Sequence, residues 1–147
     1  MQLADLEQTL LQAVAADRIG TPVAFRLHAQ LAEPESDLAG ICAAGLQVAE
    51  KLLGARSSRL FAQQNSGGNQ WQILVNYSSG ATVSLTVGRG ISTQNRVNGL
   101  VVGNHGIARL EEDSEFVPPP LPLQRGVWSD RIEHSLRTRA PVDIAAT

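Results

Sequence analysis

The segment Asp37-Leu-Ala-Gly-Ile-Cys-Ala-Ala-Gly-Leu-Gln-Val-Ala-Glu-Lys-Leu-Leu-Gly54 decides the fold. Its apolar residues recur at helical spacing, which predicts a helix with one buried side. Ser36 or Asp37 can accept the first free backbone N–H groups, and Gly54 suits the left-handed end of a helix. Cys42, the only cysteine, lies on this apolar stretch. We therefore predict a buried, unreactive thiol.

Working outward from this helix, the sequence alternates between apolar and polar residues, which predicts strands. Tight turns between successive strands favour antiparallel pairing. The sequence thus predicts an α+β fold: an open, mainly antiparallel sheet of about six strands with two or three helices packed on one face. Strands are expected over 23–31, 59–64, 71–77, 81–87, 97–102 and 107–111, with an edge strand at 141–144, and helices also over 3–16 and 127–138.

The length of the chain, 147 residues, predicts one domain spanning 1–147. Within it, Pro118-Pro-Pro-Leu-Pro122 is incompatible with a helix or a central strand. Residues 117–124 are therefore expected to be an extended linker to the last helix. The alternative is a ligand for a proline-binding module.

The predicted sheet has two contrasting faces. The apolar face, with Trp71, Ile73, Val75, Val83 and Leu85, is expected under the helices. A solvated face usually mixes in Lys and Glu, but the second face is polar and uncharged. This pattern predicts an interface, and hence a homo-oligomer through the open sheet face; the alternative is an ordinary solvated sheet. The interface residues we expect are Gln72, Asn76, Thr82, Ser84 and Thr86.

Segment 37–54 resembles a helix in the second domain of the glucose–fructose oxidoreductase / inositol dehydrogenase (Gfo/Idh/MocA) family. That helix typically reads Asp-x-Gly-x-His-x-x-Asp, followed by apolar residues and Leu-x-Gly. Aligned on Gly54, the family's His falls on Ala44 and its Asp on Gln47. Four further segments resemble that domain in the same order, namely 17–23, 74–83, 98–110 and 128–136.

The chain departs from the family at the positions that carry catalysis and cofactor binding in the family's enzymes. Neither Ala44 nor Gln47 can take up or release a proton at neutral pH. No Gly-x-Gly-x-x-Gly cradle for a dinucleotide follows a strand. The family's Glu-Lys-Pro is also absent. The resemblance therefore implies a non-catalytic, stand-alone oligomerisation or binding module that needs no cofactor. One alternative is part of a split NAD(P)-dependent sugar or polyol oxidoreductase whose Rossmann domain is on a partner chain. Another is a small-molecule sensor that uses the former substrate cleft.

Other candidate residues favour structural roles. His28, His105 and His134 lack the i, i+4 spacing of a helical metal pair, and His105 fits a Gly-flanked turn whose conformation suits Asn104. Arg89, between Gly88 and Gly90, allows an anion contact or a flexible strand end. The acidic run 111–115 is expected to be solvated. No metal site is predicted.

Composition excludes some partners. The formal net charge is −2 and Lys51 is the only lysine, so a nucleic-acid partner is disfavoured. No apolar stretch reaches the roughly 20 residues of a membrane span, and the N-terminus lacks the basic region of a signal peptide. We expect a cytoplasmic protein with no membrane partner.

Overall fold

The central helix α2 (Leu38–Leu53) forms with the ends that its sequence predicts. Asp37 is the N-cap, and its side chain accepts a hydrogen bond from the N–H of Gly40 at 3.1 Å. Gly54 is left-handed, with φ 60°, and its N–H donates to the carbonyl of Glu50. The computed structural model describes residues 3–16, 18–54, 56–111 and 127–144, so the predicted linker at 117–124 lies outside the described residues.

The strands form one open sheet in the order β6-β5-β1-β4-β3-β2-β7. Five of its six strand pairings are antiparallel. The predicted α+β class, with an open and mainly antiparallel sheet, is confirmed, and the sheet has seven strands instead of about six. The strands are β1 (Pro22–Leu31), β2 (Ser57–Gln64), β3 (Gln70–Tyr77), β4 (Thr82–Arg89), β5 (Arg96–Gly103), β6 (Ile107–Glu111) and β7 (Val142–Asp143).

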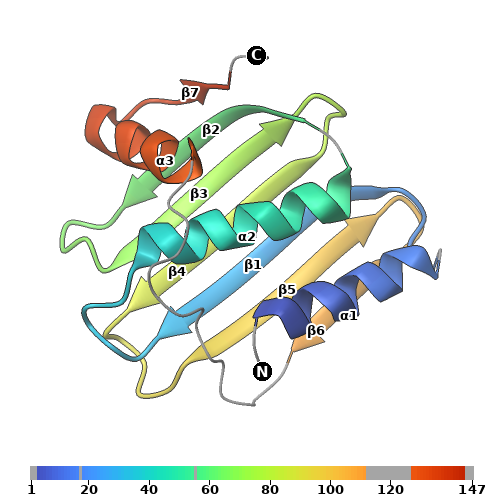
Figure 1. The fold of residues 1–147 in the computed structure, drawn as a ribbon, viewed down its shortest axis with the longest axis horizontal. Helices are drawn as coiled ribbons and strands as arrows, with labels where there is room; N and C mark the ends of the chain where they lie inside the picture. Colours follow the sequence, from blue (N-terminus) through green and yellow to red (C-terminus); the bar gives the residue numbers. More distant parts are fainter. Residues whose placement is uncertain (1–2, 17, 55, 112–126, 145–147) are drawn as a thin grey trace.

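One pairing in the sheet is parallel, and it joins two strands that are not successive in the sequence. β1 and β4 are parallel and lie side by side at the centre of the sheet. After β1 the chain crosses the sheet through α2, and β2, β3 and β4 then return as a meander (Figure 1). The crossover carries the chain to β2, three positions from β1, and the returning meander places β4 in the position beside β1.

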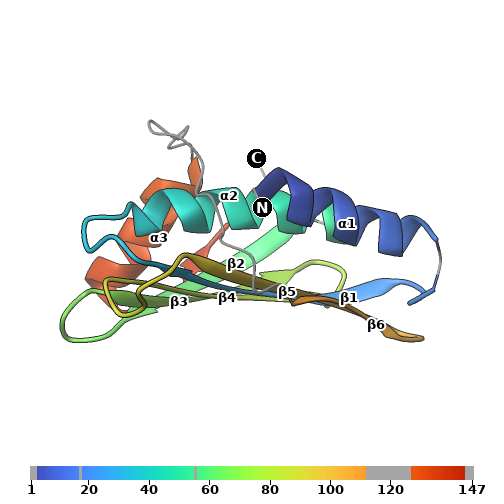
Figure 2. The same cartoon turned by 90° about the horizontal axis from the view of Figure 1, so that it is seen from below.

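All three described helices cover the same face of the sheet. Figure 2 shows α1 (Leu3–Ala15), α2 and α3 (Val127–Thr138) on one side, with no described element on the other. Two glycines allow the close contact between the layers. A Cβ at Gly99 of β5 would lie 3.0 Å from Leu6 of α1, and a Cβ at Gly45 of α2 would lie 3.0 Å from Leu27 of β1.

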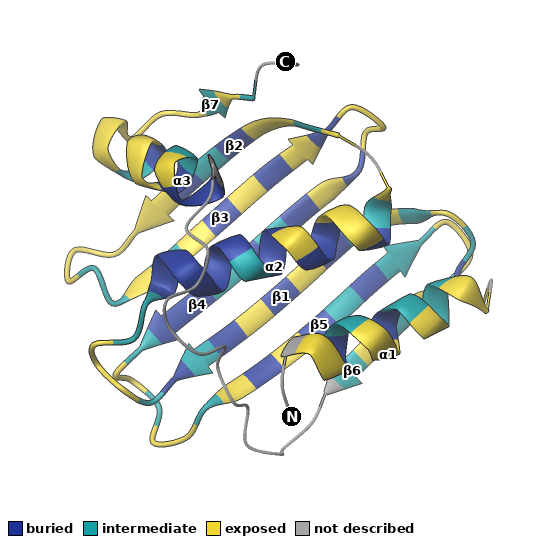
Figure 3. Cartoon of the chain, viewed as in Figure 1, coloured by how far each residue is buried: buried dark blue, intermediate teal, exposed yellow. Residues whose placement is uncertain are grey.

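The buried residues follow from this one-sided arrangement. The dark bands of Figure 3 cover nearly all of the N-terminal half of α2 and every second position of the central strands. The alternate positions are exposed or half-buried. None of the described helices is both long and apolar enough to cross a membrane. The fully buried core is centred on Phe25, Leu46, Leu60, Ile73, Val75 and Leu85.

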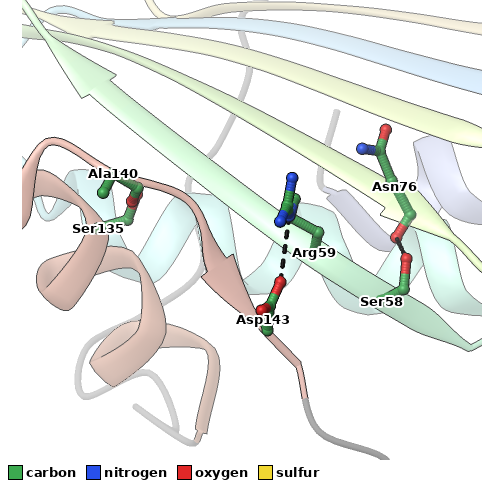
Figure 4. Close-up of polar contacts among 6 residues, drawn as sticks. All are labelled: Ser58, Arg59, Asn76, Ser135, Ala140 and Asp143. Carbon is green, nitrogen blue, oxygen red and sulfur yellow. Dashed lines mark hydrogen bonds and ion pairs between the residues drawn. The ribbon is translucent and has the colours of Figure 1, made fainter.

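The β2 edge of the sheet is covered by the C-terminal elements. The short strand β7 pairs with only two residues of β2. Beyond that point the buried hydroxyl of Ser135, on α3, accepts from the N–H of Ala62 at 2.9 Å and donates to the carbonyl of Ala140 at 2.7 Å. At the end of the edge, Arg59 donates to Asp143 at 3.1 Å (Figure 4). The hydroxyl of Ser135 thus replaces the missing strand partner of Ala62, because buried backbone groups need hydrogen-bond partners.

Candidate functional site

Ala44 and Gln47 lie on the side of α2 that faces away from the sheet. Ala44 is half-buried and Gln47 is exposed, whereas Cys42, Gly45 and Leu46 beside them are buried. Residues three apart share one side of a helix, so the two positions are neighbours, as the family motif requires. Neither side chain can take up or release a proton near pH 7, so this pair cannot perform general acid–base catalysis.

Four hollows among the described residues lie away from these two positions. They are on the open face of the sheet, beside the β2–β3 turn, and along the outer sides of α1 and α3. Neither Ala44 nor Gln47 lines any of these four.

The five residues predicted to form an interface do share the open face. They come from the adjacent strands β3 and β4, where Asn76 pairs with Thr82 and Gln72 with Thr86. Ser84, the fifth, pairs with Leu74, an apolar side chain that is 43% exposed. Alternation along each strand directs these side chains away from the helices.

The open face as a whole carries charged side chains, so the expectation of an uncharged face is wrong. The parallel pairing sets β1 directly beside β4, so Arg26 lies next to Ser84 and His28 next to Thr86. The alternating pattern of β1 was visible in the sequence, but its position beside β4 follows only from the topology. β5 and β6 add Asn98, Leu100 and Arg109, among others, to the same face.

The open face is hollowed over its centre, with a volume of about 810 Å³. Two guanidinium groups, Arg26 and Arg109, border the hollow, together with His28. Hydroxyl and amide groups from β3, β4 and β5 line the rest, and Leu74 and Leu100 supply apolar surface. Of these side chains, arginine is the type that is enriched in protein–protein interfaces.

A pair of side chains at one end of the face illustrates how tightly it is built. Gln30 lies over Gly88, where a Cβ would come within 2.4 Å of Gln30 Oε1. Its Nε2 atom lies 3.2 Å from Nε2 of His28. Gln30 Oε1 is itself buried and has no partner among the described residues. A buried acceptor of this kind is costly.

The other candidates have structural roles. The Arg89 guanidinium donates to the carbonyls of Ser36 at 2.8 Å and Gly68 at 3.2 Å, so Arg89 joins two loops. Cys42 is fully buried as predicted, and burial raises the pKa of its thiol well above the usual range. Among the described residues, no group of three His, Cys, Asp or Glu side chains could hold a metal ion.

The turn around His105 forms for a reason other than the one we expected. Gly103 and Gly106 are not among the described glycines with positive φ, and neither is Asn104 among the other residues with positive φ. The turn is held by long-range contacts: the N–H of Thr21 donates to the side-chain oxygen of Asn104 at 2.9 Å, and the N–H of His105 donates to the carbonyl of Ile19 at 2.8 Å. His105 is thus part of a turn, and its side chain has no assigned chemistry.

Solved structures with this arrangement of helices and strands include inositol dehydrogenases. Scyllo-inositol dehydrogenase from Lactobacillus casei, solved with NAD(H) and scyllo-inositol, superposes with a TM-score of 0.72 at 11% identity, over 97% of this chain and 62% of that one. Myo-inositol dehydrogenase from Corynebacterium glutamicum gives 0.72 at 10% identity, over 96% and 62%. The fold is that of the second domain of Gfo/Idh/MocA enzymes.

The resemblance predicted from the sequence is thereby confirmed at the level of the fold. Myo-inositol 2-dehydrogenase from Lactobacillus plantarum gives a TM-score of 0.70 at 14% identity, over 93% of this chain and 62% of that one. This chain therefore spans about three-fifths of the length of such enzymes. No protein-family model matches the sequence, and no curated protein matches it either.

Proposed function

We propose that this second-domain fold acts as a non-catalytic assembly module that binds a second copy of itself through the open face of its sheet. The observation that carries the proposal is the open face itself. One side of a seven-stranded sheet has no cover among the described elements, yet it bears Leu74 and Leu100 among hydroxyl, amide and guanidinium groups. An uncovered sheet with exposed apolar side chains is poorly defended against association.

The size of this face supports the proposal. From β6 to β2 the face is six strands wide, and most of these strands have eight residues. At about 4.8 Å between strands and about 3.4 Å per residue, its area is roughly 780 Å². A stable interface buries about 800 Å² on each partner, so two copies stacked face to face would reach the ordinary size.

The test is a pair of lysine substitutions at the centre of the face. Thr82→Lys with Thr86→Lys should separate the assembly without unfolding it, because each new ammonium group can reach water in the monomer and would be buried in the dimer. Light scattering at tens of micromolar should give twice the monomer mass for the wild type and the monomer mass for the variant.

The matched control places the same substitutions on the helix side. Thr9 of α1 and Thr138 of α3 are both exposed. Thr9→Lys with Thr138→Lys adds the same charge to the opposite side of the molecule and should leave the dimer intact. A wild type that runs as a monomer, or a control that dissociates as readily as the variant, would contradict the proposal.

The alternative is an enzyme subunit whose dinucleotide-binding part lies on another chain. The scyllo-inositol dehydrogenase structure favours it, because that protein carries NAD(H) and only 62% of it corresponds to this chain. Ala44 and Gln47 argue against it, since a partner can supply a lysine but cannot rebuild α2. General acid–base catalysis is typically worth 10²–10⁴-fold. Saturable binding of NADH or NADPH to this chain at micromolar concentration, measured by fluorescence, would favour the enzyme over the module.

A further inference from the structure

A row of six side chains runs straight across the middle of the open face. The strand register pairs Arg109 with Leu100, Leu100 with Arg26, and Arg26 with Ser84. It continues from Ser84 to Leu74 and from Leu74 to Phe61. Read from β6 to β2, the row is therefore Arg109, Leu100, Arg26, Ser84, Leu74 and Phe61. The line between β1 and β4 divides it into two halves of three residues.

The two halves of this row complement each other position by position. Next to the dividing line, a guanidinium group (Arg26) stands opposite a hydroxyl group (Ser84). At the second position both halves carry a leucine. At the third position Arg109 in one half corresponds to Phe61, an aromatic ring, in the other. No position pairs a cation with a cation.

We infer that two copies stack with their two-fold axis parallel to the strands, above the line between β1 and β4. This inference rests on the proposed function and specifies its geometry. Such an axis lays β1 over the partner's β4, β5 over its β3, and β6 over its β2. Arg26 then meets the partner's Ser84, and Leu100 meets the partner's Leu74. Because a two-fold interface is isologous, each contact occurs twice.

The contacts made in this orientation are chemically favourable. Arg26 donates to the hydroxyl oxygen of the partner's Ser84, the two leucines bury apolar surface, and Arg109 can lie over the ring of the partner's Phe61. The adjacent row follows the same rule. There His28 meets the partner's Thr86, and Asn98 meets the partner's Gln72, which are pairs that can hydrogen-bond.

The other symmetric orientation, with the axis across the strands, is less favourable. It lays each strand on its own copy, and where the axis crosses this row, Arg26 on β1 and Arg109 on β6 approach the same residues of the partner. Guanidinium groups stay charged at any physiological pH, and like charges brought together away from water repel. Twist rotates aligned sheets by about 30° relative to each other, which displaces residues least near the axis. Arg26 with Ser84, and Leu100 with Leu74, are thus the diagnostic pairs.

Thiol cross-linking distinguishes the two orientations. Leu74→Cys and Leu100→Cys are made as separate proteins, one with a tag that changes its size, then mixed and allowed to exchange. A bifunctional thiol reagent that spans the roughly 10 Å between packed sheets should link the two different variants to each other. Both leucines face away from the core, so the fold should tolerate the changes, and the native Cys42 is fully buried and should not react.

We expect the mixed product, in which the Leu74→Cys protein is linked to the Leu100→Cys protein, to exceed either product formed between identical variants. Adding Thr82→Lys and Thr86→Lys to both proteins should abolish it, which shows that it arises within the dimer. Cross-links between identical variants, or a wild type of dimer mass without the mixed product, would overturn the orientation and leave the proposed function standing. A monomeric wild type with no cross-link would overturn both.

Discussion

Leu85 and Leu74 lie on adjacent strands of one sheet, yet Leu85 is completely buried and Leu74 is 43% exposed. Leu85 points toward α2, where its methyl groups lie 3.4 and 3.5 Å from the position that a Cβ at Gly45 would occupy. Leu74 points the other way, beside Ser84 on the open face. The same residue type thus serves the core of the monomer on one face and is available to a partner on the other.

The two faces of the sheet differ in how closely their side chains are packed. Under the helices, every second residue of the central strands is apolar and packed, with little room for a larger side chain at Gly45 or Gly99. The open face mixes leucine, threonine, asparagine and arginine over a broad hollow. The first face is therefore expected to set the free energy of unfolding, and the second to set the affinity between copies.

The largest effect should come from the buried leucine. Leu85→Ala leaves a cavity under α2, and such changes lower the free energy of unfolding by about 2–5 kcal/mol. Leu74→Ala should change it by less than about 0.5 kcal/mol, as for surface residues in general. Both variants are made in the Thr82→Lys and Thr86→Lys background, which removes the contribution of association to stability. Urea unfolding then measures the free energy of unfolding of each variant. Equal losses at the two positions would refute the contrast between the faces.

A buried hydroxyl at the β2 edge should give the next largest effect. Ser135→Ala leaves the N–H of Ala62 and the carbonyl of Ala140 without their partner. An unsatisfied buried group costs about 1–3 kcal/mol, and urea unfolding should show a loss in this range. Ser84→Ala in the same background is the control, and we expect its effect to stay within about 0.5 kcal/mol. A neutral Ser135→Ala variant would mean that water replaces the hydroxyl.

Much of the fold could be predicted because its signals are local. Apolar periodicity, the cap at Asp37 and the glycine at Gly54 fixed the ends of α2, and the last helix occupies the predicted residues 127–138. The parallel pairing of β1 with β4 could not be predicted in this way. It depends on where the chain returns after α2, with β4 beginning about 50 residues after the end of β1, and no local pattern encodes that position.

For the same reason, only the part of the open face formed by β3 and β4 could be predicted. Alternation along β3 and β4 identified Gln72, Asn76, Thr82, Ser84 and Thr86, which share a hairpin and hence a face. Arg26 and His28 alternate just as clearly along β1, but only the topology sets them beside that hairpin. Ser135 carried no signal at all, since its partner Ala62 lies 73 residues away.

The smallest effect should come from Gly45, where two influences oppose each other. Gly45→Ala removes a helix-interior glycine, which favours the helix by about 1 kcal/mol. The new Cβ would lie 3.0 Å from a methyl group of Leu27, and overpacking a core costs about 1–3 kcal/mol. The Leu27 methyl is at the end of a flexible side chain, so the cost should fall at the low end of that range. We expect a net loss of no more than about 1 kcal/mol on urea unfolding, and a larger loss for Gly45→Leu, which would push α2 off the sheet. A gain of the full helix-propensity value for Gly45→Ala would mean that α2 is not held tightly against the sheet, and that the covered face is as adaptable as the open one.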